Sequence, residues 1–202
     1  MKKLFAVLMV ASLLPMGVVA QKLKLTKGNP SAIKNEKEML LEFDFSDFSV
    51  GKFKNEKDYK KKKIEEYNEK EPGRGDSWSE SWERDKEVRF PEKFIELYNK
   101  GSKYAKVNPN ADDAKYKMIV VTTFIEPGFN VGVMKKPASS NSIIRIVEVD
   151  NPDTIVAEFT ITGAPGSQAM GFDYDTGTRI AESYAISAKR LAALINKILK
   201  KA

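Results

Sequence analysis

The sequence predicts an α+β fold in which helices pack on a mixed, mostly antiparallel sheet of about four or five strands, within a single domain that ends in a long helix. Three observations support this prediction. The chain has 202 residues, a length typical of one domain. Apolar residues alternate with polar ones in several short segments, as in half-buried strands. Over residues 178–200 apolar residues recur at steps of three and four, as on one face of a helix.

The first twenty residues have the pattern of a cleaved signal peptide. Lys2 and Lys3 precede an uncharged, largely apolar run over residues 4–14, and residues 18–20 offer small or medium side chains for cleavage before Gln21. A retained membrane anchor is the alternative, but a run of 11 residues is shorter than the roughly 20 that a spanning helix needs. We therefore expect a signal peptide over residues 1–20 and a soluble mature protein that is periplasmic or secreted, with no transmembrane segment after cleavage.

The mature chain is predicted to begin with a flexible leader over residues 21–37, because this stretch is rich in lysine and contains Gly28, Asn29 and Pro30. The single α/β domain is expected over residues 38–202. Its first strand is predicted from Met39, where alternate residues are apolar.

Three helices are expected in the next part of the chain. The first covers residues 58–69 and ends at a loop rich in Gly and Pro. The second is predicted to begin at Ser77, because Ser77 and Glu80 match a capping box. Since proline is poorly tolerated inside a helix, the third is expected to start at Pro91 and to end at Gly101.

The strongest strand is predicted over residues 116–125, which are apolar on both faces. Such a strand is usually central and covered on both sides. A short strand is expected within residues 129–133, and residues 143–149 and 154–162 are expected to form a hairpin. The last helix follows over residues 178–200.

The composition excludes several kinds of site. The chain contains neither Cys nor His, so it has no disulfide, no thiolate or imidazole metal site, no Ser-His-Asp triad and no cysteine for a lipid anchor. The formal charge of +6 is too small to indicate nucleic-acid binding. No phosphate-binding loop motif is present, and we expect no cofactor.

Residues 51–71 contain eight lysines and six acidic residues. A solvated helix face explains such a mixed pattern. The alternative is a binding site for anionic lipid or polysaccharide.

The loop over residues 71–78 is the most unusual segment, and it leads to the candidate ligand-binding residues Arg74, Asp76, Trp78 and Trp82. Backbone amides near a helix N-terminus, with Arg74 beside them, suit an anion. The alternatives are ordinary turn chemistry and an adhesion motif, because residues 74–76 read Arg-Gly-Asp. Trp78 and Trp82 lie four residues apart, which fits either a sugar-stacking platform or core packing.

A weak metal-site candidate is formed by Asp173 and Asp175. The spacing fails the calcium loop of the EF-hand, because Gly177 stands where the third ligand is required. The alternative is that Asp175 or Thr176 caps the last helix. We therefore expect no metal.

Catalytic machinery is not evident. Lys135, Lys136 and the serine-rich residues 139–142 place Ser and Lys close together, but the spacing matches no acyl-transfer motif. Two carboxylates can converge in space for glycoside hydrolysis, yet no pair stands out.

The export signal, the Gly51-Lys52-Phe53 turn before a charged helix, the loop over residues 71–78 with both tryptophans, and residues 124–133 together resemble a group of uncharacterised exported proteins of Bacteroidetes-type bacteria. In order of elements the chain is also distantly similar to periplasmic α/β domains of curli-secretion lipoproteins and of lipoprotein activators of cell-wall synthases. That second resemblance implies protein–protein contacts in the envelope. The chain lacks the lipid-anchored cysteine of those lipoproteins.

These observations favour a non-catalytic protein of the bacterial cell envelope that binds or scaffolds a partner protein. The alternative is a small-ligand or glycan binder, or an enzyme that uses carboxylates or lysine on an envelope substrate. The first hypothesis predicts an exposed apolar patch near residues 71–78 or 129–133. The second predicts a pocket with an acidic residue of raised pKa.

Overall fold

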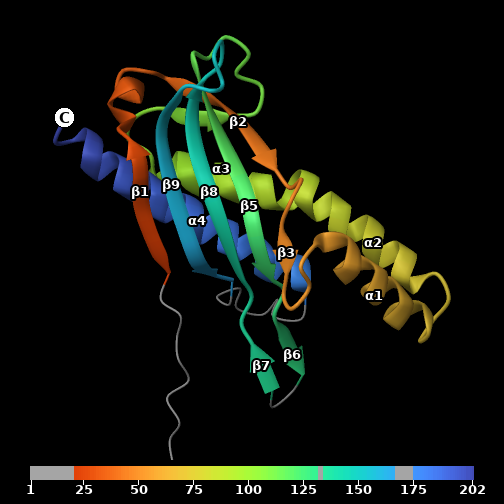
Figure 1. Cartoon of the computed structure of the whole chain (residues 1–202). Coiled ribbons are helices and arrows are strands. Elements are labelled where there is room, and N and C mark those ends of the chain that lie inside the picture. The colour runs from red at the N-terminus through yellow and green to blue at the C-terminus, as the bar shows by residue number, and fades with distance from the viewer. Residues whose placement is uncertain (1–20, 132–133, 167–174) are drawn as a thin grey trace, which may run out of the picture.

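The computed structural model describes residues 21–131, 134–166 and 175–202. It confirms the predicted α+β fold: helices pack on a mixed, mostly antiparallel sheet, and a long helix ends the chain (Figure 1). The sheet has seven strands in the described residues rather than the four or five expected. The additional strands are short or lie at an edge, where sequence patterns are weakest.

The sheet is antiparallel on one side and parallel on the other. Its main path runs β1-β9-β8-β5-β2-β4, and β3 pairs with the far end of β5. Pairs are antiparallel from β1 to β5 and parallel among β5, β2, β3 and β4. The predicted hairpin is confirmed as β8 and β9. The strands are β1 (Lys22–Gly28), β2 (Glu38–Asp44), β3 (Ser49–Val50), β4 (Lys106–Asn108), β5 (Tyr116–Glu126), β8 (Ser139–Glu148) and β9 (Ile155–Pro165).

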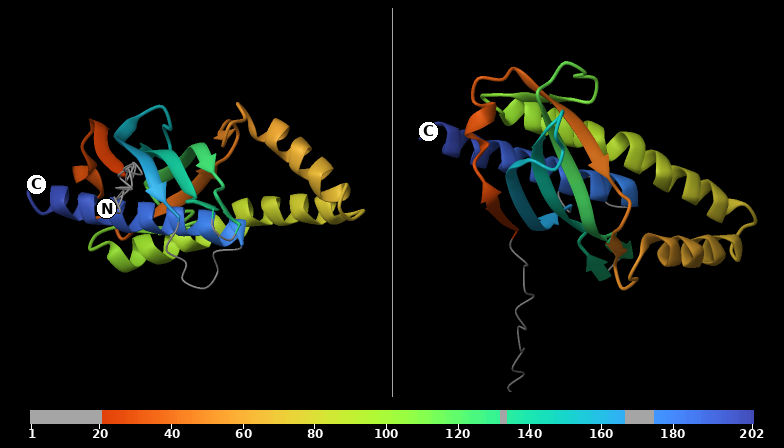
Figure 2. Two further views of the ribbon diagram at one scale, coloured as in Figure 1. Left: turned by 90° about the horizontal axis from the view of Figure 1, so that it is seen from below. Right: turned by 45° about the horizontal axis from the view of Figure 1, so that its top comes forward.

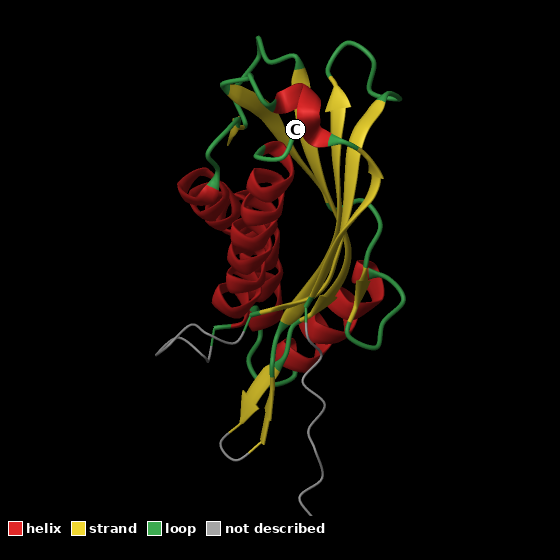
Figure 3. Cartoon of the chain, turned by 90° about the vertical axis from the view of Figure 1, so that its left-hand side faces the viewer, coloured by secondary structure: helices red, strands yellow, loops and turns green. Residues whose placement is uncertain are grey.

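The core lies between the sheet and two helices, α3 (Phe90–Gly101) and α4 (Thr176–Leu199), which pack on one face of the sheet (Figure 3). The predicted apolar stripe of the last helix is confirmed, because its residues are fully buried from Ile180 to Ile195 at steps of three and four. Aromatic rings fill the space between layers: Phe90 stacks on Tyr184, and Phe94 meets Phe43 edge-on.

The other face of the sheet is open, so the expectation that the central strand is covered on both sides is wrong. β5 is central, as predicted, and Met118 and Val120 are buried under the helices. Ile119 and Val121 are only half-buried, and no described helix lies over this face in Figure 1. Neighbouring side chains on the sheet shield them in part, since Ile143 of β8 pairs with Val121.

Residues 21–37 do not form the expected flexible leader. β1 adds to the edge of the sheet beside β9, and a 3-10 turn η1 (Pro30–Ile33) buries Ile33 completely. The sequence explains this result, because Leu23 and Leu25 alternate with lysines. Such alternation is typical of an edge strand with one face on the core and the other exposed to solvent.

The second and third helices form one long helix, so both expected starts are wrong. α2 (Arg74–Arg84) continues through a π-helical turn η2 (Asp85–Arg89) into α3. Gly73, with φ 83°, precedes α2, and the Ser77 hydroxyl lies inside the helix and donates to the Gly73 carbonyl. Pro91 is tolerated because the wider π turn relieves the backbone just before it.

Two hairpins project from the core. α1 (Glu56–Asn68) runs back along α2, and together they extend away from the sheet (Figure 2). A β-hairpin of β6 (Phe129–Val131) and β7 (Met134–Lys136) extends from the end of β5. None of the described helices is long and apolar enough to cross a bilayer.

Candidate functional site

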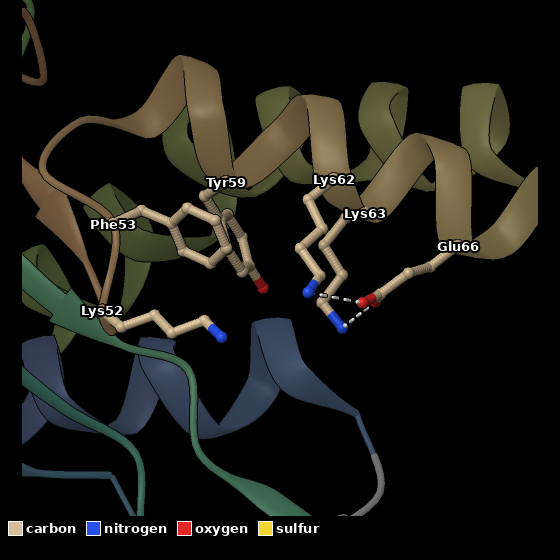
Figure 4. A pocket seen from close by; sticks show the side chains of 6 residues that line it. All are labelled: Lys52, Phe53, Tyr59, Lys62, Lys63 and Glu66. Carbon is tan, nitrogen blue, oxygen red and sulfur yellow. Dashed lines mark hydrogen bonds and ion pairs between the residues drawn. The ribbon is translucent and has the colours of Figure 1, made fainter.

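A basic, aromatic pocket lies between the first turns of α1 and the loop that enters it. Its cavity volume is about 210 Å³. Figure 4 shows the ammonium groups and the tyrosine hydroxyl directed into one shared space. The lining residues are Lys52, Phe53, Tyr59, Lys62, Lys63 and Glu66.

The local sequence explains why these side chains converge. Gly51 has φ 56°, a left-handed conformation that favours glycine, and it turns the chain directly after β3. Val50 and Phe53 then exchange two backbone hydrogen bonds of 3.0 and 2.9 Å, which closes a tight turn around Lys52. The Asn55 side chain accepts from the Asp58 amide at 2.9 Å and caps α1. Tyr59 therefore stands one turn into the helix, opposite the loop.

Packed rings hold the aromatic wall of the pocket. Tyr59 lies 5.7 Å from Phe53, 5.3 Å from Trp82 and 5.7 Å from Trp78, measured between ring centroids. Burial raises the pKa of Tyr59, and the negative charges of Glu126 and Glu66 contribute to the increase. The Tyr59 hydroxyl therefore stays protonated at neutral pH and is available as a hydrogen-bond donor.

The pocket carries a net positive charge. Lys63 and Lys62 lie 3.1 and 3.5 Å from the carboxylate of Glu66. The hydrogen bond from Lys63 holds the pKa of Glu66 below its ordinary value. Lys52 has no carboxylate partner within the part of the chain that the structure describes, and its ammonium lies 5.8 Å from the Phe53 ring centroid. Three lysines thus face one glutamate.

An ion network centred on the buried Lys86 joins α1 to α2 and η2. Lys86 lies 2.6 Å from Glu56 and 2.8 Å from Glu83, which also pairs with Lys60. Burial opposes the charge on Lys86, but its hydrogen bonds to Glu56 and Glu83 outweigh that effect and raise its pKa. The Trp82 indole donates to the same Glu56 carboxylate at 2.5 Å. The helix that carries the pocket lysines is therefore anchored at several points.

A second, larger cavity of about 470 Å³ lies between β2 and the η2–α3 junction. Its floor is apolar and includes Leu41, Phe43 and Phe45, and its rim includes Glu83 and Glu87. β4 pairs only with Glu38–Leu40, so within the described residues the outer edge of β2 beyond Leu40 has no partner strand.

The β6–β7 hairpin carries the apolar exposure that the binding-protein hypothesis expected near residues 129–133. Phe129 is 44% exposed and Met134 is 62% exposed. At the base of this hairpin Lys136 pairs with Glu126 at 2.6 Å. A side chain on Gly51 would lie 4.0 Å from the same Glu126 carboxylate, so the hairpin base adjoins the pocket loop.

The four predicted ligand-binding residues lie on α2, and they do not line the pocket. Arg74 is exposed, and its guanidinium lies over the ring of Tyr67 at 5.3 Å. Asp76 is also exposed and accepts from Asn68 at 3.4 Å. Trp78 is half-buried and Trp82 is buried, as the core-packing alternative expects. Ligand binding by any of them stays a prediction.

Asp175 is the N-cap of α4, as the alternative to a metal site predicted. Its side chain accepts from the Gly177 amide at 2.9 Å and pairs with Arg89 at 2.8 Å. Asp173, the other metal candidate, lies outside the described residues. Within the described ranges no three acidic side chains are grouped so that they can hold a metal ion.

Sequence reasoning missed the pocket residues, although it singled out the surrounding segment. A lysine run beside a Gly-Lys-Phe turn was the available signal. The pattern does not say which lysines share a face with Tyr59, because that depends on the fold of the loop.

Comparisons with known proteins identify no family. No family model matches the chain, and no curated protein matches it. The similar solved structures include a PelC dodecamer from Paraburkholderia phytofirmans, with 14% identity and a TM-score of 0.43. They also include a dodecamer of a single-substitution variant of that PelC, with 14% identity and a TM-score of 0.42. Each match covers 87% of this chain and 97% of the other. Neither likeness bears on function, and the resemblance to uncharacterised exported proteins stays a prediction.

Proposed function

We propose that the protein is an exported, non-catalytic binding protein whose pocket receives an anionic group presented by a component of the cell envelope. The observation that carries the proposal is the convergence of three lysine side chains on one aromatic-walled cavity. Export rests on the N-terminal sequence pattern, and an intact mass that begins at Gln21 is its test.

A phosphate or carboxylate group matches the chemistry of the pocket. Lys52 supplies an ammonium group without a carboxylate partner in the described chain, and Lys62 and Lys63 share one glutamate. Each ammonium group offers several donors, and the neutral Tyr59 hydroxyl adds another. Phe53 and Tyr59 exclude water from one side of the cavity, which strengthens the attraction between opposite charges.

The enzyme alternative finds less support in this pocket. It requires an acidic residue whose pKa is raised so that it can exchange a proton. The pocket carboxylate, Glu66, has a lowered pKa instead. Burial does raise the pKa of Asp85, but that side chain pairs with Arg89 at 3.1 Å and does not line the pocket.

Nuclear magnetic resonance titration with inorganic phosphate and with a galacturonate disaccharide tests the proposal. We expect amide shifts to change around Lys52, Tyr59 and Lys63, and we expect Lys52→Gln to abolish or strongly weaken them. Lys189→Gln on α4 is the matched control, because Lys189 is exposed and its loss removes the same charge. The proposal is contradicted if neither ligand changes the amide shifts of the parent protein. It is also contradicted if Lys52→Gln and Lys189→Gln weaken these ligand-induced changes equally.

A second candidate function, docking of a partner protein, is supported by the larger cavity between β2 and the η2–α3 junction. An extended segment placed beside β2 can bond to the open strand edge while its side chains enter the apolar floor. A photo-crosslinking residue at Glu87, on the rim, is expected to trap one defined protein in the native envelope. Equal trapping by the same label at Lys189 contradicts this candidate.

A further inference from the structure

We infer that the protein docks on an anionic lipid bilayer, with Phe129 of β6 and Met134 of β7 entering the interfacial layer and the pocket receiving a lipid phosphate. This inference rests on the proposed anion-binding function and names the source of the anion. It joins two features that are independent in sequence: an exposed apolar hairpin, and a basic cavity.

The apolar part is confined to one small projection. Within the described residues three large hydrophobic side chains are exposed by more than a third, and two of them, Phe129 and Met134, belong to this hairpin. The antiparallel register pairs Phe129 with Lys136, and Met134 lies two residues from Lys136 along β7. Directly opposed residues share a face, as do residues two apart along a strand. Phe129 and Met134 therefore present one face, and Figure 3 shows the hairpin extending past the end of the sheet.

The basic part lies next to this projection. Lys136 on β7 pairs with Glu126, which adjoins the Gly51–Lys52 turn at the edge of the pocket loop. Figures 1 and 3 place the hairpin and α1 at the same end of the sheet. The pocket lining and the ion pair at the base of the hairpin together contribute four lysines, Lys52, Lys62, Lys63 and Lys136, and the two carboxylates of Glu66 and Glu126.

A bilayer is the partner that matches both parts. Its surface presents phosphate groups in a negative potential, and apolar chains lie a few ångströms below. The ammonium groups of the pocket can contact the phosphate groups at the bilayer surface, while the projecting apolar side chains reach the acyl chains below them. A soluble anion accounts for the pocket but leaves Phe129 and Met134 exposed to water without a role.

Vesicle sedimentation with the mature protein tests the inference. We expect binding to vesicles of phosphatidylcholine with phosphatidylglycerol, and little binding to phosphatidylcholine alone. Lys52→Gln is expected to weaken binding about fivefold, since a lysine near an anionic surface contributes about 1 kcal/mol. Phe129→Ser with Met134→Ser is expected to weaken it at least about tenfold. Val88→Ser, which removes the third exposed apolar side chain on η2, and Lys189→Gln are the controls and are expected to bind as the parent protein does.

The outcomes separate this inference from the proposed function. Phosphate titration at the pocket without vesicle binding overturns the bilayer inference and leaves the anion pocket standing. Failure of both measurements overturns both. Vesicle binding that the hairpin double variant does not weaken also overturns the inference, because attraction by lysines alone then explains it. Binding that falls for the hairpin and Lys52 variants, while both controls bind normally, supports it.

Discussion

Gly75→Ala tests whether the close approach of α1 and α2 determines the position of the pocket. A Cβ at residue 75 would overlap the backbone carbonyl oxygen of Ile64 and come within 2.8 Å of the Ile64 Cα. It would also crowd the Asn68 side chain, which accepts from the Gly75 amide at 2.7 Å. Because two of the three nearest atoms are backbone, α1 as a whole must move.

The sign of the change in the free energy of unfolding shows whether helix propensity or the close contact between α1 and α2 dominates at residue 75. Replacing glycine by alanine inside a helix usually stabilises a protein by about 0.5–1 kcal/mol. Overpacking a close contact costs about 1–3 kcal/mol. We therefore expect a net loss of about 1–2 kcal/mol, accompanied by weaker phosphate binding as Lys62 and Lys63 shift with α1.

Urea unfolding followed by tryptophan fluorescence measures this change in stability. The signal comes from the α1–α2 region, since Trp78 and Trp82 are the only tryptophans in the chain and both lie on α2. Glu80→Ala on the exposed side of α2 is the control and should change stability by less than about 0.5 kcal/mol. A Gly75→Ala variant more stable than the parent would refute the close-packing explanation.

Three further predictions concern the core and the sheet. Leu191→Ala should destabilise by about 2–5 kcal/mol in urea unfolding, because Leu191 is fully buried under the sheet; a loss below about half a kcal/mol contradicts the packing of α4. Tyr184→Phe should cost about 1–3 kcal/mol, because it leaves the buried Thr122 hydroxyl, now 2.7 Å from the Tyr184 oxygen, without a partner. Adding Thr122→Val should recover part of that loss, because the unpaired hydroxyl is then removed. If the stability losses of the two single variants simply add in the double variant, the two hydroxyls are not coupled. The hydrogen bond from Arg145 holds the pKa of Glu158 below its ordinary 4.5, so this carboxylate contributes stability above pH 4.5 that is lost as the pH falls through the lowered pKa. The stability difference between Glu158→Gln and the parent should thus be present at pH 7 and shrink in acid; a pH-independent difference contradicts this assignment.

The sequence predicts those parts of the fold that depend on long, regular patterns. The helix stripe from Ile180 to Ile195 and the alternation along β5, β8 and β9 each specify one buried face over many residues. The short strands β3 and β4 have two and three residues, too few to show a period. The sequence predicts a break in the long helix at Pro91, because a pattern of residues does not reveal that a π turn can absorb a proline.

The candidate site was less predictable than the fold. The lysine-rich segment and the exposed apolar residues near Phe129 were both evident in the sequence, but as separate features. Their proximity depends on Glu126, which ends β5 and lies beside the Gly51 turn that follows β3. Because β3 pairs with Phe124 and Ile125, a two-residue strand that no pattern predicts brings the two features together.

The π turn at Asp85–Arg89 also determines the angular setting of the pocket relative to the core. The π turn already takes up one additional residue within the helix. Because an α-helix rotates by about 100° for each residue, a further residue inserted here would rotate α2, and α1 with it, by roughly that angle about the axis of α3. The core contacts of Phe90, Phe94 and Tyr98 lie beyond the turn and would be kept. Orientation of the pocket and stability of the core are therefore governed by different residues, and a one-residue change in chain length at this point can redirect binding without rebuilding the domain.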